Sequence, residues 1–210
     1  MKQGMIFIDG SNVFFDWNKV HPGVQMDIKK YIELIKGKYS NVEFIRTYYF
    51  TSETPTNAHF LQQINKIPYV EVKTGRLQNK TIDLQKYGVV CKSCGTALSE
   101  TITTQTDKGT DVNIAVEMLL HAFNHSYDLA ILASRDADFV GVTKILKDLG
   151  RNVELVLFEG VKSNAQELSE KVDNVTIISA TEYVNCEKKS VKSLCLEFRI
   201  HRKYRINTSC

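Results

Sequence analysis

Hydrophobic residues along the chain alternate between short runs typical of buried strands and longer stretches with helical spacing. The runs that predict strands are residues 5–8, 42–50, 69–73, 129–133, 152–158 and 175–179. The stretches in which apolar residues recur every three or four positions predict helices at 28–39, 59–66, 111–122, 139–149 and 164–171. Strands that alternate with helices favour an α/β fold in which helices wrap a parallel sheet.

Residues 77–106 interrupt this rhythm, because they are polar and show no clear hydrophobic period. We interpret them as an insertion in one domain of residues 1–180, which leaves residues 181–210 as a C-terminal tail. The insertion contains Cys91 and Cys94, spaced as one half of a structural zinc site. Cys186 and Cys195, or a second copy of the chain in a homodimer, would have to supply the other half. The alternative is a pair of free thiols in a surface loop.

The composition limits the class of protein. With 210 residues, 43% of them hydrophobic, the chain can bury one sizeable core. No apolar run approaches the ~20 residues of a membrane helix and none resembles a secretory signal, so we predict a cytoplasmic protein with no membrane association. Of the net charge of +3, the segment 186–210 carries +5, from seven Lys and Arg against two Glu. This basic tail is either a contact for phosphate backbones or a solvated chain end.

Acidic residues follow two of the predicted strands. Asp9 ends the first strand, and Asp136 and Asp138 come shortly after the strand at 129–133. In open parallel sheets, ligands bind at the carboxyl ends of the strands. Asp111 extends the buried stripe of its predicted helix, which contains Met118 seven residues later, so its carboxylate should face the same edge of the sheet.

Each of these acids, taken alone, has an ordinary structural explanation as a turn or helix-cap residue. A cluster of them needs another explanation, because two unit charges ~4 Å apart repel by about 4 kcal/mol at an effective dielectric constant of ~20. Either raised pKa values or a divalent cation must offset that repulsion. Oxygen ligands with no suitably spaced His or Cys favour Mg²⁺ or Mn²⁺, and such a site suits the hydrolysis of phosphodiester bonds.

Three ordered motifs carry a family resemblance. FIDGSN, KGTDVNIAVEMLL and DLAILASRDADFVGVTKILKDLGRNVELVLF, with the closing LSEKVDNVTII, resemble the NYN domains of the LabA-like group in the PIN-like nuclease superfamily. The resemblance spans roughly residues 5–179. It implies a three-layer α/β/α fold with a central, mostly parallel sheet of Rossmann-like topology, and a metal-dependent ribonuclease site.

The resemblance also implies roles for individual residues. The ligands of Mg²⁺ or Mn²⁺ would be Asp9, Asp111, Asp136 and Asp138, with Asn12 orienting a carboxylate, a water or the substrate. Apart from the resemblance, we expect contacts to RNA from Ser11, Arg46, Lys108, Ser134 and Arg135; for the basic residues the alternative is an ordinary solvated surface charge. Arg135 stands where the family usually has Gly, so it either crowds the site or binds phosphate.

Two further questions stay open on the sequence. The aromatic run Tyr48, Tyr49 and Phe50 ends a strand beside the predicted site, where it would either stack on unpaired bases or pack in the core. The leading hypothesis is a metal-dependent endoribonuclease, and the alternative is an RNA-binding adaptor that keeps the fold without turnover. RNA versus DNA, endonuclease versus exonuclease action, the target and the oligomeric state are left undecided.

Overall fold

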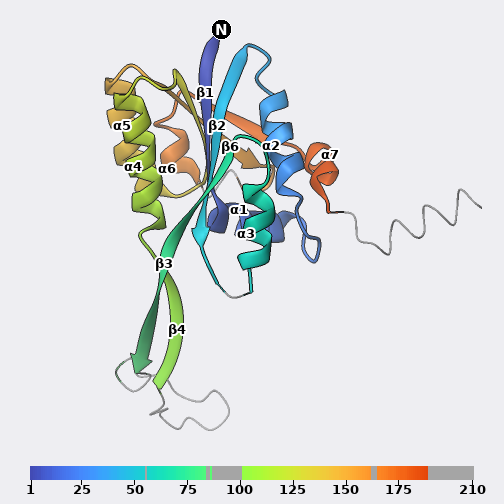
Figure 1. Ribbon diagram of the computed structural model, residues 1–210, viewed down its shortest axis with the longest axis vertical. Coiled ribbons are helices and arrows are strands. Elements are labelled where there is room, and N and C mark those ends of the chain that lie inside the picture. Colours follow the sequence, from blue (N-terminus) through green and yellow to red (C-terminus); the bar gives the residue numbers. More distant parts are fainter. Residues whose placement is uncertain (55, 84–85, 87–100, 162–164, 189–210) are drawn as a thin grey trace, which may run out of the picture.

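The computed structural model describes residues 1–54, 56–83, 86, 101–161 and 165–188 (Figure 1). The strands are β1 (Lys2–Asp9), β2 (Val42–Ser52), β3 (Val70–Asp83), β4 (Thr101–Lys108), β5 (Leu129–Ala133), β6 (Asn152–Phe158) and β7 (Asn174–Ile178). The α-helices are α1 (Gly10–Val20), α2 (Ile28–Gly37), α3 (Ala58–Asn65), α4 (Thr110–Phe123), α5 (Val140–Asp148), α6 (Gln166–Ser169) and α7 (Ala180–Tyr183), and the 3₁₀ turns are η1 (Ala137–Phe139) and η3 (Val184–Cys186). Cys91, Cys94 and the tail beyond residue 188 lie outside these ranges, so the zinc site and the basic tail stay predictions.

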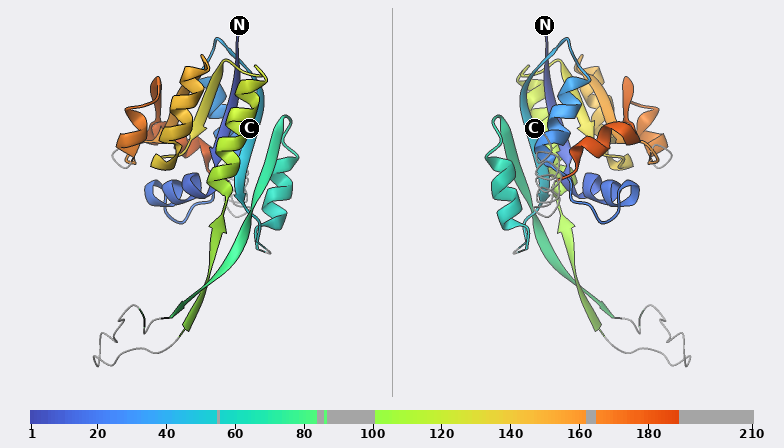
Figure 2. Two further views of the ribbon diagram at one scale, coloured as in Figure 1. Left: turned by 90° about the vertical axis from the view of Figure 1, so that its left-hand side faces the viewer. Right: turned by 90° about the vertical axis from the view of Figure 1, so that its right-hand side faces the viewer.

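Within the described part of the chain, the strands form one sheet in the order β4-β3-β2-β1-β5-β6-β7. The six strands from β3 to β7 in this order pair in parallel, and β4 alone pairs antiparallel. Helices α4, α5 and α6 cover one face, and α2, α3 and α7 lie on the other (Figures 1 and 2). The predicted α/β class with a mostly parallel central sheet is confirmed.

The register of the central strands brings their carboxyl ends to one level. Asp9, the last residue of β1, lies opposite Phe50 of β2, and Ile8 lies opposite Ala133, the last residue of β5. The chain moves from β1 toward β2 on one side and returns to β5 on the other, so the strand order reverses between β1 and β5. Ligands of open α/β sheets bind at such a switch point.

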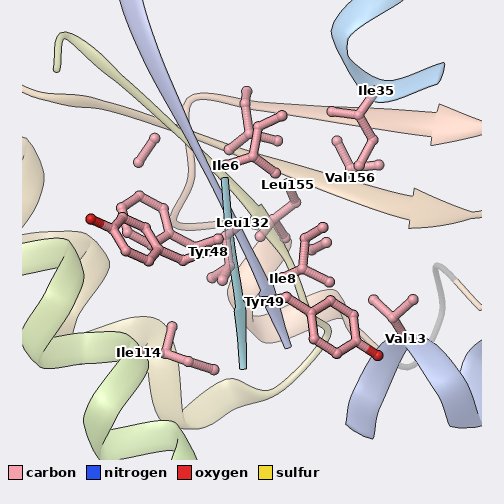
Figure 3. Close-up of a cluster of buried hydrophobic side chains, with 14 of the residues drawn as sticks. Ile6, Ile8, Val13, Ile35, Tyr48, Tyr49, Ile114, Leu132, Leu155 and Val156 are labelled. Atoms are coloured by element: carbon pink, nitrogen blue, oxygen red, sulfur yellow. The ribbon is translucent and has the colours of Figure 1, made fainter. Parts of the chain in front are cut away.

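The core holds these two strands firmly in place. Ile6, Phe7 and Ile8 of β1 have no exposed surface, and all five residues of β5 are buried. Continuous apolar strands of this kind occur where a parallel sheet is covered on both faces. On β2, Tyr48 and Tyr49 point to opposite faces of the sheet and extend the core to both layers (Figure 3).

Helix α1 was not predicted from the sequence. Where a turn was expected at Gly10–Asn12, the helix starts directly at Gly10, and the Asp9 carboxylate caps it by accepting the backbone N–H of Asn12. Only one side of α1 is buried, with Val13 and Trp17 in the core. Exposed aromatic residues and a buried acid obscure the helical period, which explains the omission.

The predicted short strand at residues 69–73 is also wrong in length, because β3 continues to Asp83. Beyond Gly75, β3 leaves the sheet and pairs only with β4, from Arg76 opposite Lys108 to Asp83 opposite Thr101. This two-stranded arm, residues 76–83 and 101–108, extends from the edge of the sheet that carries the strand ends (Figures 1 and 2). Except for residues 76, 107 and 108, it lies inside the predicted insertion, where polar residues concealed the strands.

The other predicted elements are shifted at their ends by a few residues. The largest difference is the helix expected at residues 164–171, which is reduced to α6. In the described ranges, no helix is long and apolar enough to cross a membrane.

Candidate functional site

Three carboxylates meet where β5 ends. Asp111, Asp136 and Asp138 each offer an oxygen atom, and the three oxygen atoms lie within 4.8 Å of one another. Asp136 is half-buried, whereas Asp111 and Asp138 are exposed. Of the four acids expected at this edge from the sequence, the fold therefore gathers these three into one group.

Local backbone structure fixes two of the acids together. The Asp136 carboxylate caps the 3₁₀ turn η1 by accepting the backbone N–H of Asp138 at 3.0 Å. The backbone N–H of Asp136 in turn donates to the Ser134 hydroxyl oxygen at 3.2 Å. Asp136 and Asp138 are therefore set by hydrogen bonds within the segment that follows β5.

The third acid arrives from a different part of the chain. Gly109 joins the arm to α4 with φ +88°, a left-handed conformation that glycine adopts without steric cost. The chain can therefore turn sharply from β4 into the helix, with Thr110 buried and Asp111 in the first turn. The positive end of the α4 dipole favours a carboxylate at this position.

Asp9 lies beside this group and not within it. It is only 3% exposed, and both of its oxygen atoms are used: Oδ1 accepts the Asn12 backbone N–H and Oδ2 accepts the Ser134 hydroxyl, each at 3.0 Å. Burial is the main cause that raises the pKa of Asp9 to about 6; the two hydrogen bonds lower it, and the charges of Asp111 and Asp136 raise it further. Its predicted role as a metal ligand stays a prediction.

Asn12 and Arg135 join α1 to the segment after β5. The Asn12 side-chain oxygen accepts the Arg135 backbone N–H at 3.4 Å, and Arg135 Nε donates to Asp16 Oδ1 at 2.7 Å. Asp16 is 5% exposed, so burial raises its pKa and the hydrogen bond and charge of Arg135 oppose that shift. Arg135 is therefore held against α1 through Nε, and within the described part of the chain its two terminal nitrogens show no hydrogen bond.

Asp16 was not among the site residues predicted from the sequence. An acid in the apolar row formed by Val13, Trp17 and Val20 was the available signal, since a buried carboxylate needs a partner.

Several of the expected substrate contacts lie elsewhere. Ser134 is buried, and its hydroxyl is engaged by Asp9 and Asp136, so it positions the acids and does not face solvent. Arg46 pairs with Glu71 and lies four residues before Phe50 on β2, roughly 13 Å along the strand from the level of Asp9. The expectation that these two residues contact substrate stays a prediction.

The remaining candidates differ in position. Ser11 lies half-buried in the first turn of α1, two residues after Asp9. The backbone of Lys108 ends the arm two residues before Thr110. Tyr48, Tyr49 and Phe50 are 4%, 4% and 0% exposed, so they pack in the core, and the hypothesis that they stack on bases is wrong.

The donor set fits a hard divalent cation. Oxygen ligands on opposite sides of Mg²⁺, each 2.0–2.1 Å from it, are separated by about 4.2 Å. The three carboxylate oxygens, within 4.8 Å of one another, meet that spacing after small side-chain movements. Three negative groups this close also repel one another unless a positive charge lies between them.

The fold and the site together define a class of protein: an α/β domain with an acidic group at the switch point of its parallel sheet. A family model, NYN domain, matches residues 4–180, and the chain belongs to this family, which is part of the PIN-like nuclease superfamily. The narrower assignment to the LabA-like group stays a prediction. No curated protein matches the chain.

A solved structure has the same fold. A protein of unknown function from Vibrio parahaemolyticus superposes with a TM-score of 0.60 at 15% identity, over 89% of this chain and 96% of that one. The UDP-GlcNAc 2-epimerase of Methanocaldococcus jannaschii gives a TM-score of 0.39 at 9% identity, over 83% of this chain and 38% of that one, which is too low to carry an argument.

Proposed function

We propose that this protein is a metal-dependent ribonuclease that hydrolyses phosphodiester bonds of RNA. The observation that carries the proposal is the group formed by Asp111, Asp136 and Asp138 at the switch point of an NYN fold. Carboxylates at that position suit a Mg²⁺ or Mn²⁺ ion, which when bound supplies charge stabilisation to a phosphate and activates water for attack.

The residues around the three carboxylates have positioning roles in this proposal. Ser134 fixes the Asp136 backbone and shares its hydroxyl with Asp9, which in turn starts α1. Asn12 holds the backbone at Arg135. The acids that would bind the cation are thus held by neighbours that do not themselves contact substrate.

Arg135 would bind the phosphate of the substrate. Its side chain is 33% exposed, and Asp16 occupies only Nε. The two terminal nitrogens of a guanidinium match two phosphate oxygens. Because Asp16 holds the side chain in place through Nε, we favour the phosphate contact over crowding of the site.

The decisive experiment compares RNA cleavage by the wild-type chain and by Asp136→Asn. We expect the wild type to cleave labelled RNA with Mn²⁺ or Mg²⁺ and to be silent with chelator. Asp136→Asn should reduce the cleavage rate at least 100-fold, as expected when transition-state charge stabilisation is lost. Asp148→Asn, an exposed aspartate at the end of α5, is the matched control and should cleave normally.

Two outcomes would redirect the proposal. Cleavage that persists unchanged in Asp136→Asn would exclude this site as the catalytic centre. RNA binding by the wild type without cleavage under any metal condition would favour the alternative, a catalytically quiet RNA-binding adaptor. The homodimer and the cytoplasmic location stay predictions.

A further inference from the structure

Two adjacent aromatic side chains lie exposed on the helix that starts at the site. Phe14 and Phe15 of α1 are 59% and 65% exposed, and their rings contact each other edge to face with centroids 6.0 Å apart. Burying a Phe side chain stabilises a fold, so two exposed Phe side chains forgo that stabilisation. The exposed pair is therefore a feature that the core does not explain.

The pair is close along the helix to Asp9, the carboxylate that lies beside the acidic group. Asp9 caps α1, so Phe14 and Phe15 follow it by about 8–9 Å along the helix axis. At 100° per residue, Ser11, Phe15 and Lys19 form a row that leads away from the site along the outer side of α1. Figure 2 shows α1, in dark blue, at the edge of the sheet from which the arm also leaves.

Positive charge flanks the aromatic pair. Lys19 is exposed four residues after Phe15, and Arg135 contacts α1 at Asp16, the residue next to Phe15. Phosphate groups and bases alternate along a single nucleic-acid strand, and proteins that hold such strands combine basic groups with exposed aromatic rings. Lys19 and Arg135 thus complement the backbone of a strand whose base lies on the rings.

We propose that Phe14 and Phe15 form a base-stacking site that holds an unpaired nucleobase of the RNA next to the phosphate bound at Arg135. This rests on the proposed function, because the phosphate contact is part of it. Phe15 lies on the side of α1 nearer Arg135 and takes the base, with Phe14 beside it. A base within a duplex is covered by its neighbours in the stack, so the site selects single-stranded segments.

Binding of a labelled single-stranded RNA with one 2-aminopurine, measured in chelator so that metal-dependent cleavage cannot occur, tests this site. We expect Phe14→Ala and Phe15→Ala each to weaken binding about 5- to 100-fold and to reduce the quenching of 2-aminopurine. Phe15→Tyr keeps a ring and should bind as the wild type does. Phe123→Ala, which removes an equally exposed Phe (60%) at the far end of α4, should change neither signal.

The possible results separate this inference from the proposed function. If the wild type cleaves RNA with Mn²⁺ but Phe14→Ala and Phe15→Ala bind and quench like the wild type, the stacking site is wrong and the ribonuclease stands. If the wild type does not cleave but binding depends on both rings, the stacking site stands and the ribonuclease is wrong. If Phe14→Ala and Phe15→Ala weaken the binding of a blunt duplex of the same sequence as much as that of the single strand, the site does not select unpaired bases.

Discussion

At the residue scale, Asp9 is set apart from the other acids by its surroundings. Asp111, Asp136 and Asp138 reach solvent or lie half-buried, whereas Asp9 is enclosed and bound by Asn12 and Ser134. Its raised pKa means that the folded protein holds a proton on Asp9 more tightly than the unfolded chain does. At neutral pH the ionised carboxylate of Asp9, which caps α1, therefore makes the folded state less stable than the protonated carboxyl would.

The first prediction concerns Asp9→Asn. The ordinary pKa of an Asp is 3.8, and that of Asp9 in the folded protein is about 6, so between these pH values the folded state binds more protons at Asp9 than the unfolded state does. The stability that protonated Asp9 contributes is therefore full below pH 3.8 and is lost as the pH rises through 6. We expect the free energy of unfolding of the wild type to fall relative to Asp9→Asn by about 2 kcal/mol from pH 4 to pH 7, since each pKa unit is worth about 1.4 kcal/mol and part of the shift is already lost at pH 4.

Chemical denaturation in chelator across this pH range measures the difference. Asn remains a good cap residue, so the substitution keeps the start of α1. Asp27→Asn, at the equivalent cap of α2, controls for removing a charge from a helix cap. A difference between wild type and Asp9→Asn that is constant with pH would contradict the explanation by burial.

At the element scale, α1 approaches β2 closely because Gly10 has no side chain. A Cβ atom at Gly10 would lie 2.6 Å from Tyr49 Cζ and 2.7 Å from the Phe50 carbonyl oxygen. The carbonyl is backbone and cannot rotate away. The close approach is what lets the helix start immediately after Asp9, at the level of the acids.

The second prediction follows from this contact. Gly10→Ala should destabilise the protein by about 1–3 kcal/mol, the cost of overpacking a well-filled interior, and should weaken RNA binding because α1 must move. Gly141→Ala, in α5 with no atom within 4 Å of the added Cβ, should instead stabilise by about 0.5–1 kcal/mol. Thermal and chemical unfolding of the two variants measure these changes in stability. Equal changes in Gly10→Ala and Gly141→Ala would contradict the steric explanation.

The elements differ in how well the sequence predicted them. Strands β1 and β5 were found because their apolar runs are continuous, as burial on both faces requires. The arm was missed, because the Thr-rich segment of β4 pairs with β3 and not with the core, so no hydrophobic period marks it. The hypothesis that Tyr48, Tyr49 and Phe50 stack on bases was wrong for a related reason, because whether a residue near a strand end is buried depends on the elements that pack around it.

At the scale of the whole molecule, the acidic group joins segments that are far apart along the chain. Asp111 arrives through the arm and α4, whereas Asp136 and Asp138 follow β5. A cation bound by all three would therefore stabilise the folded state alone, because the unfolded chain does not bring them together.

The third prediction uses this linkage. At about 100 times the dissociation constant, Mn²⁺ should add about 2.7 kcal/mol, which for a chain of this size raises Tm by about 5–10 °C. The rise should disappear in Asp136→Asn, persist in Asp148→Asn and be reversed by chelator in a thermal scan. An equal rise in all three proteins would show that the ion binds elsewhere.

The sequence by itself determined the class of fold and the edge at which the acids lie, because apolar runs predict buried strands and parallel strands carry their ligands at their carboxyl ends. Only the tertiary structure decided which acids meet. Asp9 is buried, its two oxygen atoms accept hydrogen bonds from Asn12 and Ser134, and it lies outside the group that Asp111 forms with Asp136 and Asp138. The pairing of Arg135 with Asp16 likewise depends on how α1 packs, since contacts between distant segments are set by packing and not by any local pattern.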